Sequence, residues 1–375
     1  MSSINRRQFF GRSAGLCGAG AILGLPWCRN AGAAIRDNKN LVEARFYQKL
    51  PNRKIKCVLC PRECVIDDLE TGYCGVRENH GGAYYTLVHS RACSAHIDPI
   101  EKKPLFHFLP GTTAFSIATV GCNVLCKFCQ NWEISQARPD QVQSFELSPE
   151  MVAQHAANNG SASIAYTYTE PVVFFEYVYD CAVAGRKNNV KSVMISNGYI
   201  QADPMRDLCK VLDAVKIDLK AFTESFYEKL VAGHLQPVLN TLLLLKKENM
   251  WTEIVYLVIP TLNDDAKELK QMCRWIKAEL GADIPVHFTR FHPVYRLKNL
   301  PPTPTKTLEM ARDIALEADL HYAYIGNVPG HEGENTFCPN CKKVVVQRIG
   351  FQIVENNIKK PGQCKFCNQK IAGFW

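Results

Sequence analysis

Short apolar runs alternate with longer amphipathic stretches between about residue 110 and residue 327. The apolar runs are rich in β-branched and aromatic residues, which is typical of buried strands, and the stretches between them have helical spacing. Strands are predicted at residues 114–120, 163–169, 191–197, 214–220, 253–259, 284–291 and 321–327. Helices are predicted at residues 171–188, 203–213, 264–281 and 305–319. This alternation indicates an α/β fold with a parallel sheet, forming a partial or full β/α (TIM-like) barrel.

The segments on either side of this repeating pattern have a different character, because each carries closely spaced cysteines. We therefore predict four parts. A signal segment covers residues 1–34, a small cysteine-rich module covers 35–105, the barrel covers 106–330, and a zinc-ribbon-like module covers 331–375.

The first segment has the features of a twin-arginine export signal. Arg6 and Arg7 precede two phenylalanines, an apolar Gly-rich stretch and small residues that suit cleavage after Ala33. The alternative is a basic, disordered tail on a cytoplasmic protein. The apolar stretch is shorter than the roughly 20 residues that span a bilayer, and no stable membrane span is expected elsewhere. The signal predicts export by the twin-arginine route, to the periplasm.

Composition narrows the function only slightly. The chain has 375 residues, a net charge of +8 and an ordinary 47% of hydrophobic residues. No long basic run is interleaved with aromatic residues, so nucleic-acid binding is not expected. The 17 cysteines are more informative, because eleven of them fall into three tight groups.

The middle group, Cys122, Cys126 and Cys129, follows the strand predicted at residues 114–120. Gly121 and Asn123 favour a loop there over a helix, so the three thiols resemble a ligand set more than core residues. A 4Fe–4S cluster has four irons, each of which needs a ligand. Three cysteines with no fourth close behind would leave one iron open.

The other two groups each offer four thiols. Cys338, Cys341, Cys364 and Cys367 are spaced as two CxxC pairs around a predicted hairpin, which indicates a zinc ribbon, with rubredoxin-like iron as the alternative. Cys57, Cys60, Cys64 and Cys74 could bind zinc or a second iron–sulfur cluster, and their spacing does not decide between the two.

Polar residues follow several predicted strands. In a β/α barrel the chemistry lies at the carboxyl ends of the strands, so these residues are expected to share one pocket. They are Thr169, Glu170, Ser196, Asn197, Asp218, Lys220, Arg290 and His292.

The spacing C-x3-C-x2-C after the first barrel strand resembles the radical S-adenosylmethionine (SAM) superfamily. The resemblance implies that the open iron binds the amino and carboxylate groups of SAM. It also implies that one-electron reduction yields a 5′-deoxyadenosyl radical, which abstracts hydrogen from a protein or small-molecule substrate. An electron donor is then a necessary partner.

Further residues match motifs of this family. Phe128 stands where the family places an aromatic beside the adenine, and Glu170 with Pro171 matches the end of its Gly-Gly-Glu-Pro segment, with Tyr168 and Thr169 in place of the glycines. The resemblance also implies cofactor-binding roles for Asn197, Asp218, Lys220 and His292, through motifs similar to those of pyruvate formate-lyase activating enzymes.

The most extended resemblance is to the radical SAM enzyme of the AmmeMemoRadiSam system, a group similar to pyruvate formate-lyase activating enzymes. It rests on CVLCPREC, DPIEKKPLFHFLPG, GCNVLCKFCQNW, YTYTEP and YIGNVPGHEGENTFCPNC. It implies an oxidoreductase similar to pyruvate formate-lyase activating enzyme, and the similarity does not extend to the glycyl-radical substrate. The alternative function is an exported iron–sulfur and zinc electron carrier without catalysis, which would need no pocket for a cosubstrate.

Overall fold

The computed structural model describes residues 41–375, which belong to one compact unit. The predicted signal, with Arg6, Arg7 and Ala33, lies outside the described residues. The predicted module boundaries at residues 105 and 330 stay predictions. None of the described helices combines the length and the apolar character that crossing a bilayer requires.

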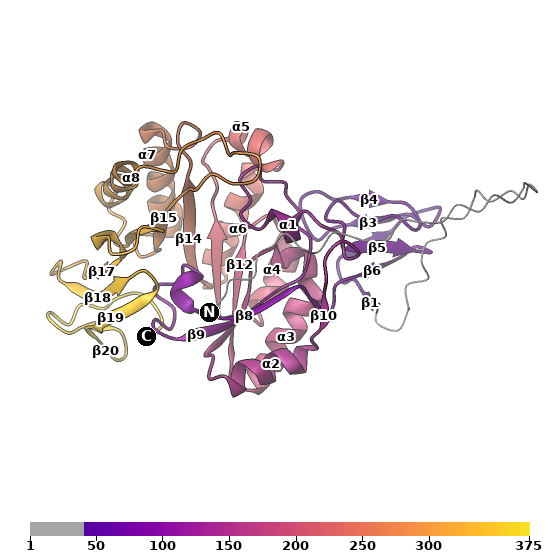
Figure 1. The fold of residues 1–375 in the computed structure, drawn as a ribbon, viewed down its shortest axis with the longest axis horizontal. Coiled ribbons are helices and arrows are strands. Elements are labelled where there is room, and N and C mark those ends of the chain that lie inside the picture. Colours follow the sequence, from indigo (N-terminus) through magenta and orange to yellow (C-terminus); the bar gives the residue numbers. More distant parts are fainter. Residues whose placement is uncertain (1–40) are drawn as a thin grey trace, which may run out of the picture. The chain divides into compact units, whose positions relative to one another are not determined.

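An eight-stranded sheet forms the centre of this unit (Figure 1). Its spatial order is β16-β15-β14-β13-β12-β11-β9-β8, and all neighbours are parallel except the edge pair β8 and β9. The strands are β8 (Ser94–Pro99), β9 (Thr113–Ala118), β11 (Ser163–Tyr166), β12 (Lys191–Ser196), β13 (Ala214–Asp218), β14 (Trp251–Val258), β15 (Val286–Arg290) and β16 (Ala323–Gly326). The seven predicted strands and the mostly parallel sheet are therefore confirmed.

The sheet is open. Within residues 41–375, pairing ends at β8 on one edge and at β16 on the other, and these two strands do not pair. The option of a fully closed barrel is thus wrong, because closure requires the two edge strands to pair. The partial barrel stays a prediction.

Helices fill the crossovers between the parallel strands, as right-handed β/α connections require. The longer ones are α2 (Pro149–Asn158), α3 (Phe175–Lys187), α4 (Ala202–Cys209), α6 (Leu235–Lys247), α7 (Ala266–Trp275) and α8 (Thr305–Glu317). The sequence pattern located α3, α4, α7 and α8 and missed α2 and α6. Short turns of helix are α1 (Trp132–Ser135), α5 (Glu224–Phe226), η2 (Ile100–Lys102), η3 (Pro171–Phe174), η4 (Tyr227–Val231), η5 (Ile276–Leu280) and η6 (Glu332–Glu334).

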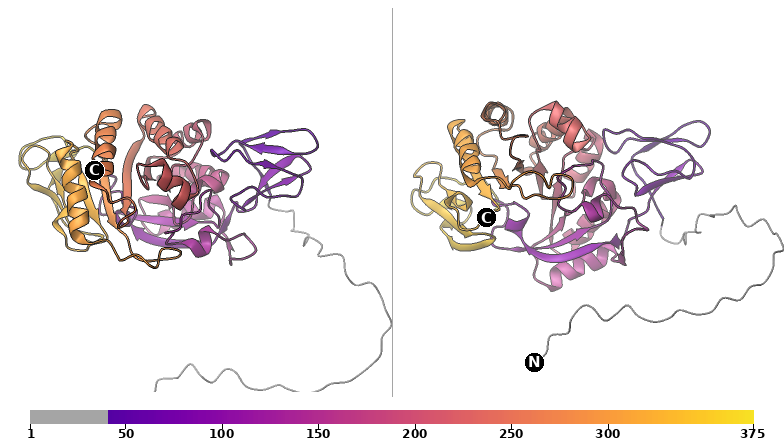
Figure 2. Two further views of the ribbon diagram at one scale, coloured as in Figure 1. Left: turned by 90° about the horizontal axis from the view of Figure 1, so that it is seen from above. Right: turned by 45° about the horizontal axis from the view of Figure 1, so that its top comes forward.

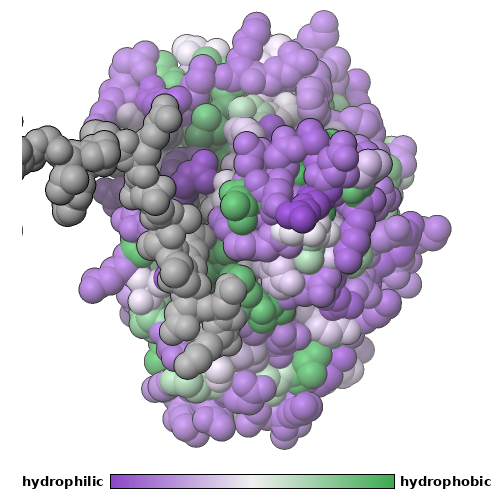
Figure 3. All heavy atoms as spheres, turned by 90° about the vertical axis from the view of Figure 1, so that its right-hand side faces the viewer, coloured by the Kyte–Doolittle hydropathy of each residue, from purple (hydrophilic) through white to green (hydrophobic). Residues whose placement is uncertain are grey.

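Two small antiparallel sheets precede the central sheet, drawn in indigo in Figure 2. One contains β2 (Tyr47–Lys49), β3 (Ile55–Cys57) and β4 (Val65–Ile66). The other contains β1 (Val42–Glu43), β6 (Ala83–Thr86) and β5 (Arg77–His80). The side of the molecule on which they lie is mostly hydrophilic, with separate hydrophobic spots (Figure 3).

The C-terminal segment forms the predicted hairpin, β18 (Val344–Ile349) and β19 (Gln352–Asn356), with β17 (Thr336–Phe337) beside it. A second strand pair consists of β20 (Ile358–Lys359) and β21 (Gln363–Cys364). It brings Cys364 and Cys367 close to Cys338 and Cys341. One further pair joins β7 (Arg91–Ala92) to β10 (Phe145–Glu146). The chain end packs against the segment before β9, where His107 Nδ1 donates to the carbonyl of Ala372 at 2.6 Å.

Candidate active site

The three-cysteine segment is a loop, as predicted, and it begins directly after β9. Gly121 starts the loop with a φ of +98°, a conformation that a residue with a side chain rarely adopts. A Cβ there would also lie 2.6 Å from the side chain of Val76 and 3.0 Å from the Cys74 carbonyl oxygen. Glycine at this position therefore allows the chain to turn where two segments meet.

The loop forms one wall of a cavity of about 520 Å³. Residues at the carboxyl ends of the neighbouring strands also line it, because parallel strands all end on the same edge of the sheet. The predicted residues that line the cavity are Cys122, Cys126, Phe128, Cys129, Thr169, Glu170, Asn197, Asp218 and Lys220. Ser196, Arg290 and His292 are not among its lining residues, although Ser196 Oγ donates to Glu170. His292 is exposed, so its cofactor role stays a prediction without support from the geometry.

Glu170 is held rigidly at the end of β11. Its carboxylate accepts from Ser196 Oγ at 2.7 Å and from the backbone N–H of Asn197 at 2.8 Å. It also caps η3 by accepting from the Val172 N–H at 3.1 Å. Burial raises the pKa of Glu170 to about 7, although these hydrogen bonds oppose the shift. A buried carboxylate in this state favours a cationic partner in the cavity.

Asp218 and Lys220 form an ion pair at the end of β13, with Lys220 Nζ 3.5 Å from the Asp218 carboxylate. Lys216 also donates to Asp218. Burial would raise the pKa of Asp218, but the two lysines outweigh it and lower that pKa. The Lys220 ammonium lies 5.8 Å from the centre of the Phe128 ring. This corner of the cavity thus combines a fixed charge pair with an aromatic face.

Among the other lining residues are Lys103 and Phe351, which the sequence analysis did not single out, and Tyr168, which it noted only as a replacement for a glycine. Tyr168 has a φ of +65° and donates its hydroxyl to Asp98, and the Lys103 ammonium lies 4.5 Å from its ring centre. Lys103 belongs to the quoted DPIEKKPLFHFLPG motif, which was a usable signal. Phe351 comes from the hairpin of the C-terminal segment, and nothing local in its sequence indicates a site.

The three thiols do not meet the spacing of a set that binds a single ion. A single tetrahedral ion needs ligand atoms that lie close together. Among residues 41–375, some groups have ligand atoms that all lie within 4.8 Å of one another, and Cys122, Cys126 and Cys129 belong to none of these groups. A cluster provides a separate iron for each thiolate and so needs wider spacing. Asn197 Nδ2 lies 3.9 Å from the Cys122 sulfur. Burial raises the pKa of the Cys126 thiol, and the Lys220 charge opposes that rise.

Cys338, Cys341, Cys364 and Cys367 do meet the single-ion spacing. The sulfurs of Cys338 and Cys367 are 3.6 Å apart, and those of Cys341 and Cys364 are 3.7 Å apart. Four sulfurs placed tetrahedrally at Zn–S bonds of about 2.3 Å would be about 3.8 Å apart. The donor set therefore fits one zinc ion, or one iron ion with the same ligands.

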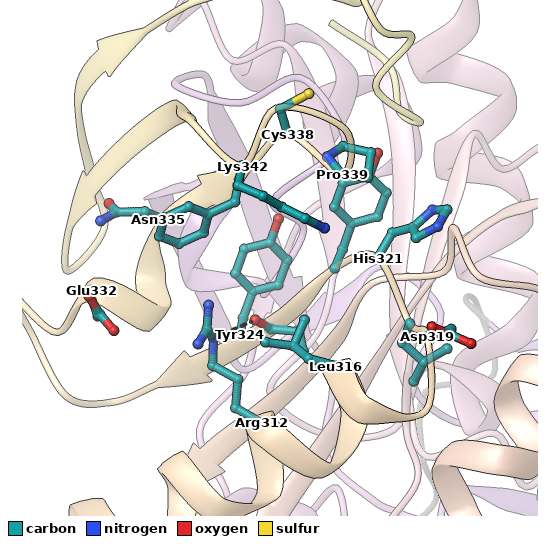
Figure 4. A pocket seen from close by; sticks show the side chains of 14 residues that line it. Arg312, Leu316, Asp319, His321, Tyr324, Glu332, Asn335, Cys338, Pro339 and Lys342 are labelled. Atoms are coloured by element: carbon teal, nitrogen blue, oxygen red, sulfur yellow. Dashed lines mark hydrogen bonds between the residues drawn. The ribbon is translucent and has the colours of Figure 1, made fainter.

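A second cavity of about 530 Å³ lies between α8 and the C-terminal segment (Figure 4). Arg312, Tyr324 and Lys342 are among its lining residues. Its only cysteine among the described lining residues is Cys338, which belongs to the C-terminal set. The cavity is therefore separate from the three-cysteine loop.

Comparison with known proteins agrees with this geometry. A family profile described as the radical SAM superfamily matches residues 116–275. An uncharacterized protein of Methanocaldococcus jannaschii, MJ0808, is 46% identical over 330 residues, which cover 88% of this chain and 98% of the relative. A second uncharacterized protein of that organism, MJ0674, is 24% identical over 253 residues, or 65% of this chain and 68% of the relative.

Solved structures match only in part. A domain of pyruvate-formate lyase-activating enzyme from Bacteroides vulgatus has a TM-score of 0.40 and 14% identity, covering 44% of this chain and 100% of that domain. A radical SAM methyltransferase from Sphaerobacter thermophilus has a TM-score of 0.46 and 14% identity, covering 60% and 71%. The family assignment rests on the profile and the 46% identical relative: this chain belongs to the radical SAM superfamily, which implies a radical enzyme that uses a 4Fe–4S cluster and SAM.

Proposed function

We propose that Cys122, Cys126 and Cys129 hold a 4Fe–4S cluster whose remaining iron is open to SAM. The observation that carries this proposal is the cavity, because all three thiols line it together with polar groups from the carboxyl ends of β11, β12 and β13. When bound, the cluster and SAM together supply one-electron cleavage of SAM and a 5′-deoxyadenosyl radical that abstracts a hydrogen atom from a substrate.

The chain's own residues bind and orient the cosubstrate. The Glu170 carboxylate is an acceptor for the methionine ammonium, since burial makes a cationic partner favourable there. Asp218 and Lys220 present fixed charges for the ribose hydroxyls and the methionine carboxylate, and Phe128 offers a face for the adenine. Such fixed positioning matters because a radical must meet its target bond before competing groups react.

Lys103, Tyr168 and Phe351 line the same cavity and have no place in this assignment of the cosubstrate. We assign them to the side of the cavity that faces the substrate, which is a protein or a small molecule. The proposed activity resembles that of the activating enzymes for glycyl-radical enzymes, and a one-electron donor is required as a partner. An electron carrier without catalysis is less well supported, because it needs no cavity beside its cluster.

The test is anaerobic reconstitution with reductant and SAM, followed by measurement of 5′-deoxyadenosine. Wild type should form it, and Cys126→Ala should lower the yield by at least about 100-fold, because a cluster left with two protein ligands is not held. Cys209→Ala, on α4 and outside every cysteine group, is the matched control and should stay close to wild type. Equal yields from wild type and Cys126→Ala would refute the assignment.

We also propose export by the twin-arginine route, on the sequence of residues 1–34 alone. A fusion of residues 1–40 to a reporter that is active only after export in a folded state should be exported. Replacing both Arg6 and Arg7 by lysine should retain the reporter in the cytoplasm. Export that does not change on this replacement, or no export of the unaltered fusion, would contradict the signal.

A further inference from the structure

The four N-terminal cysteines meet at one end of the small sheet β2–β3–β4. Cys57 ends β3, and its N–H donates to the carbonyl of Cys64, just before β4, at 2.9 Å. Cys60 lies in the turn between them, where its carbonyl accepts from the Glu63 N–H at 3.1 Å. Cys74 arrives from the loop before β5, which turns at Gly75 with a φ of +73°. Backbone hydrogen bonds thus hold Cys57, Cys60 and Cys64 in one turn of this sheet, and Cys74 lies in the loop that leads into β5.

The thiols are close enough to interact but wider apart than a single-ion set. Burial raises the pKa of Cys60 to about 12, and the charges of Cys57, Cys64 and Cys74 add to that shift. These cysteines nevertheless belong to none of the groups in residues 41–375 whose ligand atoms all lie within 4.8 Å of one another. In this respect the N-terminal set resembles Cys122, Cys126 and Cys129 and differs from the zinc-like C-terminal set.

A buried cation lies beside this set and has a free donor. Arg77 is 1% exposed, pairs with Glu176 of α3 through Nη2, and donates from Nε to the Val173 carbonyl at 3.1 Å. Its Nη1 is buried and has no hydrogen-bond partner among the described residues. Arg77 begins β5 three residues after Cys74, and its charge opposes the rise that burial causes in the pKa of Cys57. An unpaired buried donor beside thiols points to an anionic group between them.

The set also touches the proposed active site. The Cys74 carbonyl and the Val76 side chain are the atoms that a Cβ on Gly121 would meet first. In addition, Arg62 Nε donates to the Asn123 carbonyl at 2.6 Å, inside the three-cysteine loop. The N-terminal cysteines therefore lie against the loop that carries Cys122.

We propose that Cys57, Cys60, Cys64 and Cys74 bind a second iron–sulfur cluster rather than zinc. Four thiolates complete the ligands of such a cluster, so this centre has no open iron for SAM. Arg77 Nη1 supplies a hydrogen bond to the sulfur-rich anion, which accounts for the unpaired donor. The inference concerns a separate site and does not depend on the proposed reaction.

The decisive variant removes the first cluster and leaves the second. Anaerobically reconstituted Cys122→Ala/Cys126→Ala/Cys129→Ala protein should retain two to four irons, a rough range for one Cys-ligated cluster, with an equal amount of acid-labile sulfide. Adding Cys60→Ala and Cys74→Ala should remove nearly all of this iron and sulfide. Adding Cys93→Ala and Cys209→Ala instead, at two cysteines outside the groups, should leave both unchanged.

Zinc is measured on the same samples. A second equivalent of zinc in place of iron, lost with Cys60→Ala and Cys74→Ala, would overturn the proposal, and so would the absence of any metal there. Wild-type protein gives an answer even if the variants fail to fold. An iron content of about six to eight per chain supports the second cluster, and about four per chain refutes it. None of these counts depends on 5′-deoxyadenosine formation, so failure of the proposed reaction stays distinguishable.

Discussion

At the scale of single residues, the site depends on groups that the backbone has already fixed. The Glu170 carboxylate accepts three hydrogen bonds, one from the Val172 N–H and two from residues at the end of β12, so it has little conformational freedom. Asn197 is similarly fixed, because its Nδ2 donates to Asn123 Oδ1 at 2.9 Å and its Oδ1 accepts from the Tyr199 N–H at 2.8 Å. Side chains held in this way bind a ligand without a further loss of conformational entropy.

Glu170→Gln should weaken SAM binding by about 10- to 100-fold, because a charge-assisted hydrogen bond is worth about 1.5–3 kcal/mol. The iron content should be unchanged, since Glu170 is not a proposed ligand. Calorimetric titration of the reconstituted protein with SAM measures the affinity. Glu146→Gln, at an exposed glutamate of β10, is the control and should bind like wild type. Unaltered affinity in Glu170→Gln would remove this residue from the site.

At the scale of elements, short strands bring cysteines that are distant in sequence into contact. β20 and β21 place Cys364 and Cys367 against Cys338 and Cys341. The hairpin β18–β19 lies between the two cysteine pairs in the sequence, and Phe351 at its turn lines the candidate active site. The segment that brings the four C-terminal cysteines together therefore also contributes a residue to the cavity.

The double variant Cys338→Ser/Cys341→Ser should lose about one zinc per chain, because a four-coordinate site does not survive the loss of two ligands. Iron and sulfide should remain. Elemental analysis of the purified protein makes the measurement, with Cys209→Ser as the control. Loss of iron with retained zinc would reverse the assignment of the metals.

At the scale of the whole molecule, a buried polar network joins the chain end to the sheet. Glu253 of β14 accepts from the N–H groups of Phe106 and His107, at 3.0 and 2.9 Å, and from His287 Nε2 at 2.8 Å. His107 also contacts the Ala372 carbonyl and the Tyr324 hydroxyl. With Nδ1 donating and Nε2 accepting, a neutral imidazole satisfies both contacts.

Acid should destabilise the fold through this network. Burial lowers the pKa of His107 to about 4, although the Glu253 charge opposes the shift. A histidine with a lowered pKa takes up its proton on unfolding, so its contribution is present above about pH 6.5 and is lost as the pH falls towards 4. Relative to His107→Gln, wild type should lose on the order of 3 kcal/mol of unfolding free energy across that interval.

Denaturant unfolding at several pH values between 7.5 and 4 measures this difference. His155→Gln, at an exposed histidine of α2, is the control and should follow wild type. A His107→Gln protein with the same pH dependence as wild type would show that another group governs acid stability.

The sequence by itself determined the seven parallel strands, the cysteine loop after the first of them and the hairpin between the C-terminal CxxC pairs. These features depend on local hydrophobic spacing, on glycine and on ligand spacing, all of which are visible along the chain. The sequence pattern also indicated that Glu170, Asn197 and Lys220 would meet, because parallel strands end on one edge.

Only the tertiary structure decided the rest. It left the sheet open, because pairing at an edge depends on distant strands and not on local pattern. It placed His292 outside the cavity and brought in Tyr168, whose positive φ is set by its contacts, and Phe351, which arrives from a segment distant in sequence. It also distinguished the three cysteine groups, because only the C-terminal four have sulfurs that all lie within 4.8 Å of one another. Sequence spacing does not determine such distances, since loops of equal length can have different geometries.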